Sequence, residues 1–186
     1  MTIFIPQYFS QQFQPLIGVL NSNASTEKSD RMITKLEHSN EVVAEQIHTV
    51  FQNSYKVEAE LIGVLDFPPL LRNISDIVNA KTAFYGFSFI DSDKHCLAAV
   101  IEIQIDEKHL AIDSLTVEPN FFRKSIADKL INYALKSFDI DVAIVETAVV
   151  NKPAIKLYEK HGFMEFKRWT PSHGIEKLAM SVEVTC

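Results

Sequence analysis

Apolar and polar residues alternate through the middle of the chain in a pattern that predicts β-strands. Three such stretches cover residues 83–90, 96–105 and 109–117, and the polar segments DSDK and DEK separate them. Breaks this short join antiparallel strands, because a parallel pair needs a crossover of about a dozen residues or more. The central third of the chain is therefore predicted to form two consecutive hairpins.

Helical spacing of apolar residues occurs on both sides of these strands. A short strand is expected at residues 32–37, and Asn40 can cap a helix whose apolar face runs over residues 43–55. A second helix over residues 57–65 ends before Pro68, because proline cannot donate the helical hydrogen bond. After the hairpins the pattern predicts a helix at 126–138, a strand at 141–150, a helix at 152–162, and strands at 163–169 and 175–184.

A polar run, NSNASTEKSD at residues 21–30, divides the chain. Residues 1–30 are expected to form an N-terminal extension with a linker, and residues 31–186 to form one domain. A chain of 186 residues, 47% of them apolar, is long enough for one sizeable core. The first segment has no basic start and is interrupted by Pro6 and Pro15, so it does not resemble a signal peptide.

Charge and cysteine content argue against several classes of protein. A formal charge of −6, with no cluster of lysine and arginine, argues against nucleic-acid binding. Cys96 and Cys186 lie far apart and do not suggest a disulfide framework, which favours a reducing cytoplasm. The histidines lack the paired spacing of a metal site, and no apolar stretch reaches membrane-spanning length.

The segment from Val117 to Leu135 joins a predicted strand to a predicted helix through a basic turn. The first N–H groups of a helix lack internal partners and carry partial positive charge, so such a junction can bind phosphate. Glycine usually allows the ligand to approach closely, but this turn contains none. Ser125 followed by Asp128 also fits a capping box, so a purely structural role stays open.

A second motif, NKPAIKLYEKHGF, occupies residues 151–163. A cap at Asn151, Pro153 in the first turn and Gly162 at the left-handed end explain it as a helix. The combination resembles the GNAT acyltransferase superfamily, whose late region has the same spacing as Asn151, Ala154, Leu157, Tyr158, Glu159, Lys160, Gly162 and Phe163.

This resemblance covers roughly residues 31–184, because Leu115 to Val117 with Pro119 are similar to the end of the family's fourth strand. It implies an α+β, GNAT-like acyltransferase fold, with a mixed, mostly antiparallel central sheet flanked by helices. The expected order of elements agrees with that fold.

The family's pyrophosphate loop reads Gln or Arg, two variable residues, Gly, one variable residue, then Gly or Ala. This chain has Phe122 and Ser125 at the first two specified positions, and Ala127 alone conforms. The loop is therefore degenerate, yet the backbone N–H groups of residues 124–127 remain available whatever the side chains are.

Side chains of the turn act on an anion in both directions. Arg123 and Lys124 attract it, while Asp128 on the first helical turn competes for the same partial charge. We expect binding of coenzyme A that is weakened but retained, and a Ser125→Gly variant that binds it at least as tightly.

The resemblance implies direct transfer of an acetyl group from acetyl-CoA to an amine. Tyr158 occupies the family position of the acid that protonates the departing thiolate. A base or a water chain must deprotonate the amine, because a lysine-like amine titrates near pH ~10.4. Asp113 is favoured over Glu102 as that base, because it alternates with the apolar Ala111 and Leu115, where burial raises a carboxyl pKa.

For three polar residues the sequence allows a structural role as well as a functional one. Glu102 alternates with Val100 and Gln104 and can equally face solvent, Glu146 is similar, and Asn151 either contacts the coenzyme or only caps its helix. Main-chain groups of the fourth strand are implied to hold the pantetheine arm and the thioester carbonyl. The expected catalytic residues are Tyr158, Asp113 and Glu102, and the expected coenzyme contacts are Leu115, Thr116, Val117, Arg123, Lys124, Ser125, Ile126, Ala127 and Asn151.

Two functions stay open at this point. One is an N-acetyltransferase that acts on a primary amine of a small molecule or peptide. The other is a non-catalytic GNAT-like domain that binds a ligand or partner through its drifted loop. Residues 1–30 can pack on the domain, close the acceptor site or swap into a homodimer partner.

Overall fold

A computed structural model describes residues 33–64, 66–91 and 94–184, so the predicted extension at 1–30 lies outside the described residues. The strands are β1 (Ile33–Leu36), β2 (Ala83–Asp91), β3 (Lys94–Asp106), β4 (His109–Val117), β5 (Val142–Ala148), β6 (Met164–Trp169) and β7 (Lys177–Glu183). The helices are α2 (Glu41–Ile62), α3 (Ile74–Val78), α4 (Ile126–Lys136) and α5 (Lys152–Lys160), with short 3-10 turns η1 (Pro68–Leu71) and η2 (Pro119–Phe121).

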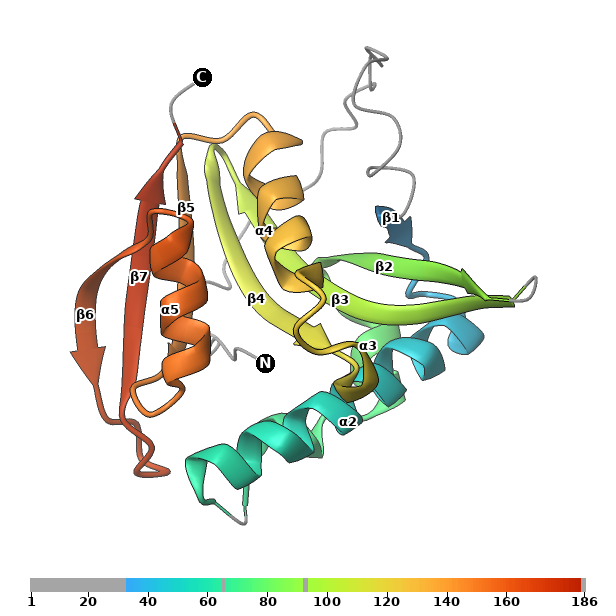
Figure 1. Ribbon diagram of the computed structural model, residues 1–186, viewed down its shortest axis with the longest axis horizontal. Helices are drawn as coiled ribbons and strands as arrows, with labels where there is room; N and C mark the ends of the chain where they lie inside the picture. The colour runs from blue at the N-terminus through green and yellow to red at the C-terminus, as the bar shows by residue number, and fades with distance from the viewer. Residues whose placement is uncertain (1–32, 65, 92–93, 185–186) are drawn as a thin grey trace.

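The seven strands form one sheet in the order β1-β2-β3-β4-β5-β7-β6 (Figure 1). Neighbouring strands are antiparallel except for the central pair, β4 and β5, which is parallel. The connection between these two is α4, as a parallel pair requires a crossover. The predicted α+β fold with a mixed, mostly antiparallel sheet is confirmed.

Alternate strand residues enter two separate cores, one on each face of the sheet. On one face, α2 and α3 cover the sheet, and Phe51 packs with Phe84. On the other face, α4 and α5 contribute Leu130 and Tyr158 to a core that includes Ile101. We refer to these as the α2 face and the α4 face.

The helix pattern before the hairpins was predicted less well than the strands. Residues 41–62 form one continuous helix, capped by Asn40 and ended by Gly63 in the left-handed conformation, so the expected break near residue 56 is wrong. Its apolar face continues through the buried Ala59, so packing against the sheet stabilises the helix beyond residue 56. The second helix of this region is instead α3, which was missed because it has only five residues.

Candidate active site

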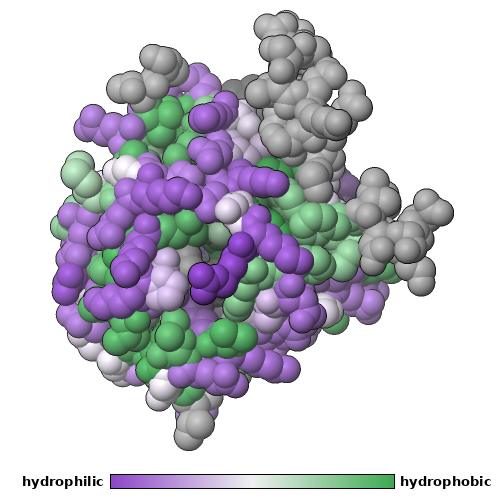
Figure 2. All heavy atoms as spheres, in the orientation of Figure 1, coloured by the Kyte–Doolittle hydropathy of each residue, from purple (hydrophilic) through white to green (hydrophobic). Residues whose placement is uncertain are grey.

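The central slot of the sheet forms where β4 and β5 separate. Their pairing ends at Ile112 and Val145, although β4 continues to Val117 and β5 to Ala148. Beyond that point the edge of β4 that faces β5 has no partner strand among the described residues. The face that carries α4 and α5 is hollowed near its middle, with both hydrophilic and hydrophobic residues at the border (Figure 2).

A β-bulge changes the direction of the side chains in this part of β4. Glu102 pairs with Ser114 and Ile103 with Ile112, so Asp113 is the extra residue. Strict alternation would have put Asp113 on the side of Leu115, but Ile112 and Leu115 both enter the α4-face core. The expectation that Asp113 shares an apolar face with Leu115 is therefore wrong, because the bulge shifts the alternation between them.

Glu102 is the centre of a buried hydrogen-bond network on the α2 face. Its carboxylate accepts two hydrogen bonds from Arg72, at 2.6 and 2.9 Å, one from Thr82 at 2.6 Å and one from Ser114 at 3.1 Å. The residue is 3% exposed, so the alternative that it faces solvent is wrong. These hydrogen bonds fix the orientation of the Glu102 carboxylate and connect it to β4 and to the segment around Arg72 and Thr82.

The network also fixes the bulge to helix α2. The Tyr55 hydroxyl lies 3.1 Å from the Ser114 hydroxyl, and burial raises the pKa of Tyr55. The Arg72 guanidinium lies 5.4 and 5.5 Å from the ring centres of Phe51 and Phe84, a favourable cation–π arrangement. Helix α2 and the strands β2, β3 and β4 thus meet at the bulge, immediately after the point where β4 separates from β5.

Asp113 lies beside this network and has an unusual acidity. Burial, and then the negative charge of Glu102, raise the pKa of Asp113 to about 7, although Arg72 acts in the opposite direction. Glu146 on β5 also contributes, and burial raises the pKa of that carboxyl too. A carboxyl group with a pKa near neutrality can accept a proton and release it again at physiological pH.

The turn before α4 has an uncommon backbone conformation. Arg123 and Ser125 have φ angles of 61° and 55°, in the left-handed region that favours glycine. Ser125 precedes the helix but makes no side-chain cap hydrogen bond, so the capping-box interpretation is wrong. The N–H groups of Ile126, Ala127 and Asp128 consequently have no acceptor among the described residues, which is the arrangement of an anion site.

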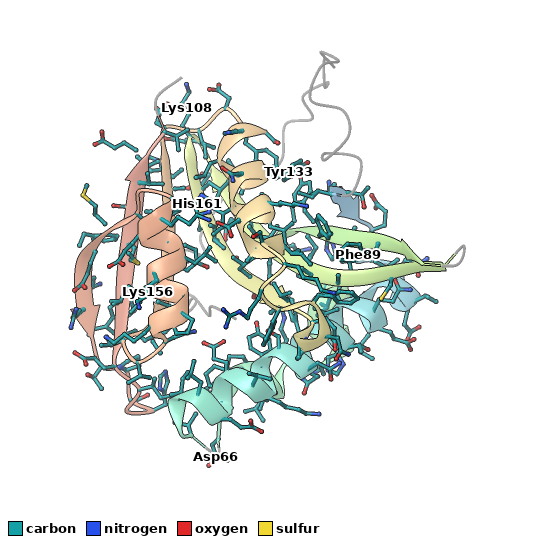
Figure 3. The ribbon with its side chains drawn as sticks, viewed as in Figure 1. Asp66, Phe89, Lys108, Tyr133, Lys156 and His161 are labelled. Atoms are coloured by element: carbon teal, nitrogen blue, oxygen red, sulfur yellow. The ribbon has the colours of Figure 1, made fainter. Side chains whose placement is uncertain are left out.

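The carboxylate of Asp128, in the first turn of α4, forms ion pairs within the protein. Its carboxylate pairs with Lys160 at 2.5 Å and with His161 at 3.1 Å, both at the end of α5. Figure 3 shows His161 between α5 and α4. Burial opposes these contacts, but the two hydrogen bonds lower the pKa of Asp128 overall. Its negative charge is thus largely compensated, and the predicted conflict with phosphate is reduced.

Tyr158 lies on α5 and is fully buried. Its ring packs edge-to-face on Phe163 at 5.4 Å, and its hydroxyl has no hydrogen-bond partner in the described part of the chain. Burial, and then the negative charge of Glu58, raise its pKa. A buried hydroxyl without a partner is rare in folded proteins, and it leaves the Tyr158 hydroxyl available for a further hydrogen bond.

Asn151 is occupied at both ends of its side-chain amide. The oxygen accepts from the N–H of Ala154 at 3.2 Å and caps α5, while the nitrogen donates to Glu58 at 3.0 Å. These contacts favour the structural alternative for Asn151, as a cap and as a connection to α2.

Comparison with known proteins now decides the family. The profile of the acetyltransferase (GNAT) family matches residues 44–163, which is more than half of the chain. The chain belongs to this family.

Among curated relatives, the UPF0157 protein YqkA of Bacillus subtilis (strain 168) is 30% identical over 145 residues, covering 77% of this chain and 41% of that protein. N-alpha-acetyltransferase 30 of Xenopus laevis is 33% identical over 82 residues, covering 40% of this chain and 30% of that protein. The chain therefore spans less than half the length of the curated relatives it matches.

Solved structures of GNAT proteins share the fold. The ribosomal-protein-S18-alanine N-acetyltransferase of Escherichia coli has a TM-score of 0.63 at 14% identity, covering 83% of this chain and 94% of that chain. An aminoglycoside 6'-N-acetyltransferase complexed with coenzyme A has a TM-score of 0.61 at 14% identity, covering 83% and 97%.

Most of the predicted GNAT site residues lie around the slot. Leu115, Thr116 and Val117 are buried on the separated part of β4, and residues 123–127 form the turn and first helical residues of α4. Sequence reasoning missed Arg72 and Glu58. A signal for Glu58 was present, because it continues the buried face of α2 at helical spacing, but the helix had been divided at that point.

The described residues contain no group of three His, Cys, Asp or Glu side chains that could hold a metal ion. Within the same part of the chain, no helix combines the length and apolar character of a membrane span.

Proposed function

We propose that this chain transfers an acetyl group from acetyl-CoA to a primary amine of a small molecule or peptide by direct attack. Membership of the GNAT family supports this proposal. So do a curated relative named N-alpha-acetyltransferase 30 and a structural neighbour complexed with coenzyme A.

The observation that carries the proposal is the turn before α4. Arg123 and Ser125 keep the left-handed conformation although neither is glycine, and such a conformation costs about 1–2 kcal/mol for each L-residue. Strain of this kind persists where the surrounding structure or a ligand requires it. The first N–H groups of α4 have no acceptor among the described residues, so they can donate hydrogen bonds to the diphosphate of the coenzyme, beside the cations of Arg123 and Lys124.

The separated edge of β4 suits the extended arm of the same molecule. Those N–H and C=O groups of residues 113–117 that point away from β3 have no partner strand among the described residues, and an extended ligand can take the place of such a strand. Leu115 and Val117 supply apolar walls on the α4 face.

Two side chains suit the proton transfers that the reaction needs. An ammonium acceptor loses two protons as it becomes an amide, and the departing sulfur takes up one. The Asp113 carboxylate accepts protons from the nitrogen as its lone pair forms the bond to the thioester carbon. The Tyr158 hydroxyl donates a proton to the sulfur as the carbon–sulfur bond breaks, and the net product is one released proton.

Binding and turnover test the proposal in sequence. Acetyl-CoA at one hundred times its Kd should stabilise the fold by about 2.7 kcal/mol and raise the melting temperature. Release of free thiol in the presence of primary amines should then follow. A shift in melting temperature without thiol release from a broad amine panel would favour the non-catalytic alternative, and no shift at millimolar acetyl-CoA would overturn both binding and catalysis.

A further inference from the structure

The first turn of α4 carries a carboxylate next to the N–H groups that the proposed function assigns to the diphosphate. Asp128 lies in this turn, and its own N–H is one of the groups without an acceptor among the described residues. A carboxylate in the first turn uses the same partial positive charge that a bound anion would use. It therefore opposes the anion unless its own charge is compensated.

The compensating groups come from the end of a different helix. The Lys160 ammonium lies 2.5 Å and the His161 Nε2 atom 3.1 Å from Asp128, and both contact the same oxygen, Oδ1. Lys160 is the last residue of α5, and His161 follows it. Since 32 positions separate Asp128 from Lys160, the contact exists only because the fold brings the start of α4 to the end of α5.

These two partners of Asp128 differ in charge at neutral pH. A lysine side chain is an ammonium ion with no acceptor lone pair, so Lys160 supplies a permanent cation. Burial lowers the pKa of His161, although its hydrogen bond to Asp128 acts in the opposite direction. The charges of Lys160 and of Lys136, on α4, lower it further. His161 is therefore mainly neutral at neutral pH and becomes a cation in more acidic solution.

We infer that Lys160 sets the affinity of the protein for acetyl-CoA through Asp128, and that His161 takes over this role when it is protonated. This inference rests on the proposed function. By cancelling the charge of the carboxylate, Lys160 leaves the N-terminus of α4 available to the diphosphate. Lys160 is thus a positioning residue, which acts on the coenzyme through Asp128 and not by contact.

An ion pair between two helices can also serve only to hold them together. A contact that merely held α4 against α5 would weaken coenzyme binding after loss of either partner. Charge compensation gives a different result for the two partners. Loss of Lys160 should weaken binding, whereas loss of the charge on Asp128 should not, because no carboxylate then remains to oppose the diphosphate.

A double-mutant cycle tests this, with the full chain at about pH 8 and the Kd of acetyl-CoA measured by calorimetry. Lys160→Met should raise Kd about threefold to tenfold, the scale of one charge at a helix N-terminus, whereas Lys160→Arg should stay within about twofold of wild type. Asp128→Asn should bind at least as tightly as wild type. Adding Lys160→Met to Asp128→Asn should then change Kd by less than about twofold.

Two results of the cycle would overturn the inference. An equal loss from Lys160→Met in both backgrounds would show that Lys160 acts on the coenzyme directly. Weaker binding by Asp128→Asn would show that the ion pair only holds the helices together. Lys108→Met is the matched control, because Lys108 also pairs with carboxylates but precedes β4, at the other end of that strand from the turn. Its Kd should equal that of wild type.

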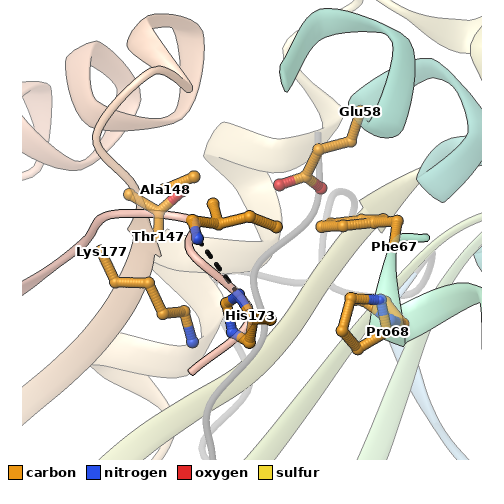
Figure 4. A pocket seen from close by; sticks show the side chains of 9 residues that line it. Glu58, Phe67, Pro68, Thr147, Ala148, His173 and Lys177 are labelled. Carbon is orange, nitrogen blue, oxygen red and sulfur yellow. Dashed lines mark hydrogen bonds between the residues drawn. The ribbon is translucent and has the colours of Figure 1, made fainter. Parts of the chain in front are cut away.

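The pH dependence of Lys160→Met tests the role of His161. Protonation of His161 restores a cation beside Asp128, so the ratio of variant Kd to wild-type Kd should fall toward one between about pH 8 and about pH 5.5. The ratio is the readout because a phosphate monoester itself titrates near pH ~6. Adding His161→Gln should abolish the change. Adding His173→Gln should not, because His173 lies in the loop after β6, where its Nδ1 accepts from the N–H of Ile175 at 3.3 Å (Figure 4).

Binding by wild type separates this inference from the proposed function. Cooperative melting of each variant shows that it is folded. Normal binding of acetyl-CoA by wild type, with an unchanged Kd in Lys160→Met, would refute the inference alone. A ratio that does not change with pH would refute the role of His161. Absence of binding by wild type would refute the proposed function, and this inference with it.

Discussion

In the part of the chain that the structure describes, the hydroxyl groups of Tyr158 and Thr147 are buried and have no hydrogen-bond partner. Each reduces stability by about 1–3 kcal/mol relative to a satisfied or absent hydroxyl. Tyr55 gives the contrast, because it is equally buried but its hydroxyl lies 3.1 Å from that of Ser114. The same type of side chain is thus structural at one position and available for chemistry at the other.

Replacing Tyr158 by Phe should separate stability from activity. Removing an unpartnered hydroxyl should raise the free energy of unfolding by about 1 kcal/mol, while loss of the proton donor should lower kcat by about 100-fold or more. Denaturation and thiol-release assays measure the two effects. Tyr55→Phe is the control and should lose stability, so parallel stability changes in the two variants would contradict this account.

Variants of Glu102 and Asp113 should show which of the two carboxyl groups acts as the base. Glu102→Gln removes a negative charge close to Asp113 while Arg72 remains, so the pKa of Asp113 should fall. The acidic limb of the kcat/KM profile should then move to lower pH with activity retained. Asp113→Asn should lose about 100-fold in rate at neutral pH. Loss of activity in Glu102→Gln, in a protein that still melts cooperatively, would instead make Glu102 the base.

At the scale of elements, the end of α5 compensates negative charge next to the turn before α4. The turn leaves helix N–H groups without acceptors, and Lys160 and His161 neutralise the acidic residue of the first helical turn. Burial outweighs the contact with Asp128 and lowers the pKa of His161, so the pairing with Asp128 depends chiefly on Lys160 at neutral pH.

Glycine at position 125 should stabilise the turn before α4, because glycine adopts the left-handed conformation without strain. Ser125→Gly removes the left-handed penalty and should raise the free energy of unfolding by up to about 1 kcal/mol, with acetyl-CoA bound at least as tightly. Ser137→Gly, at the other end of the same helix with a φ of −96°, should destabilise the fold. Calorimetric titration and thermal melting check both variants, and weaker coenzyme binding by Ser125→Gly would refute the assignment of the turn.

Sequence patterns predicted the elements well where one local rule acts alone. All of the predicted strands are present, since each alternates or is continuously apolar between polar breaks. The pattern failed at the bulge in β4, where one extra residue shifts the alternation, and at the junction inside α2. The Tyr158 motif was recognisable because its residues are close in sequence, within α5 and at its two ends.

The remaining site residues were not predictable because their partners are distant in sequence. Glu58 and Asn151 are bonded across 93 positions, and Arg72 and Glu102 across 30. No local period encodes such a contact. Thr147 looks like an ordinary strand residue until the surrounding elements leave its hydroxyl without a partner.

Over the whole molecule, burial of acidic groups makes stability depend on pH. Because the pKa of Asp113 is raised to about 7 in the folded state, the folded protein holds this proton more tightly than the unfolded chain. Its contribution to stability is fully present below about pH 4 and is lost as the pH rises to about 7.

Asp113→Asn should therefore be more stable than wild type at pH 8 by about 2–4 kcal/mol, and the difference should shrink toward pH 4. Urea denaturation at several pH values measures this. Asp106→Asn, at an exposed position, is the control and should follow wild type throughout. A difference between Asp113→Asn and wild type that does not change with pH would show that the carboxyl is not perturbed.

The separation of β4 from β5 has a consequence for how the end of β4 is held in the sheet. Beyond Ile112 and Val145 the two strands no longer pair, so the last residues of β4 are held in the sheet by β3 alone. An extended donor that adds to this edge, as proposed above, would close the sheet across the separation and hold the end of β4 from both sides.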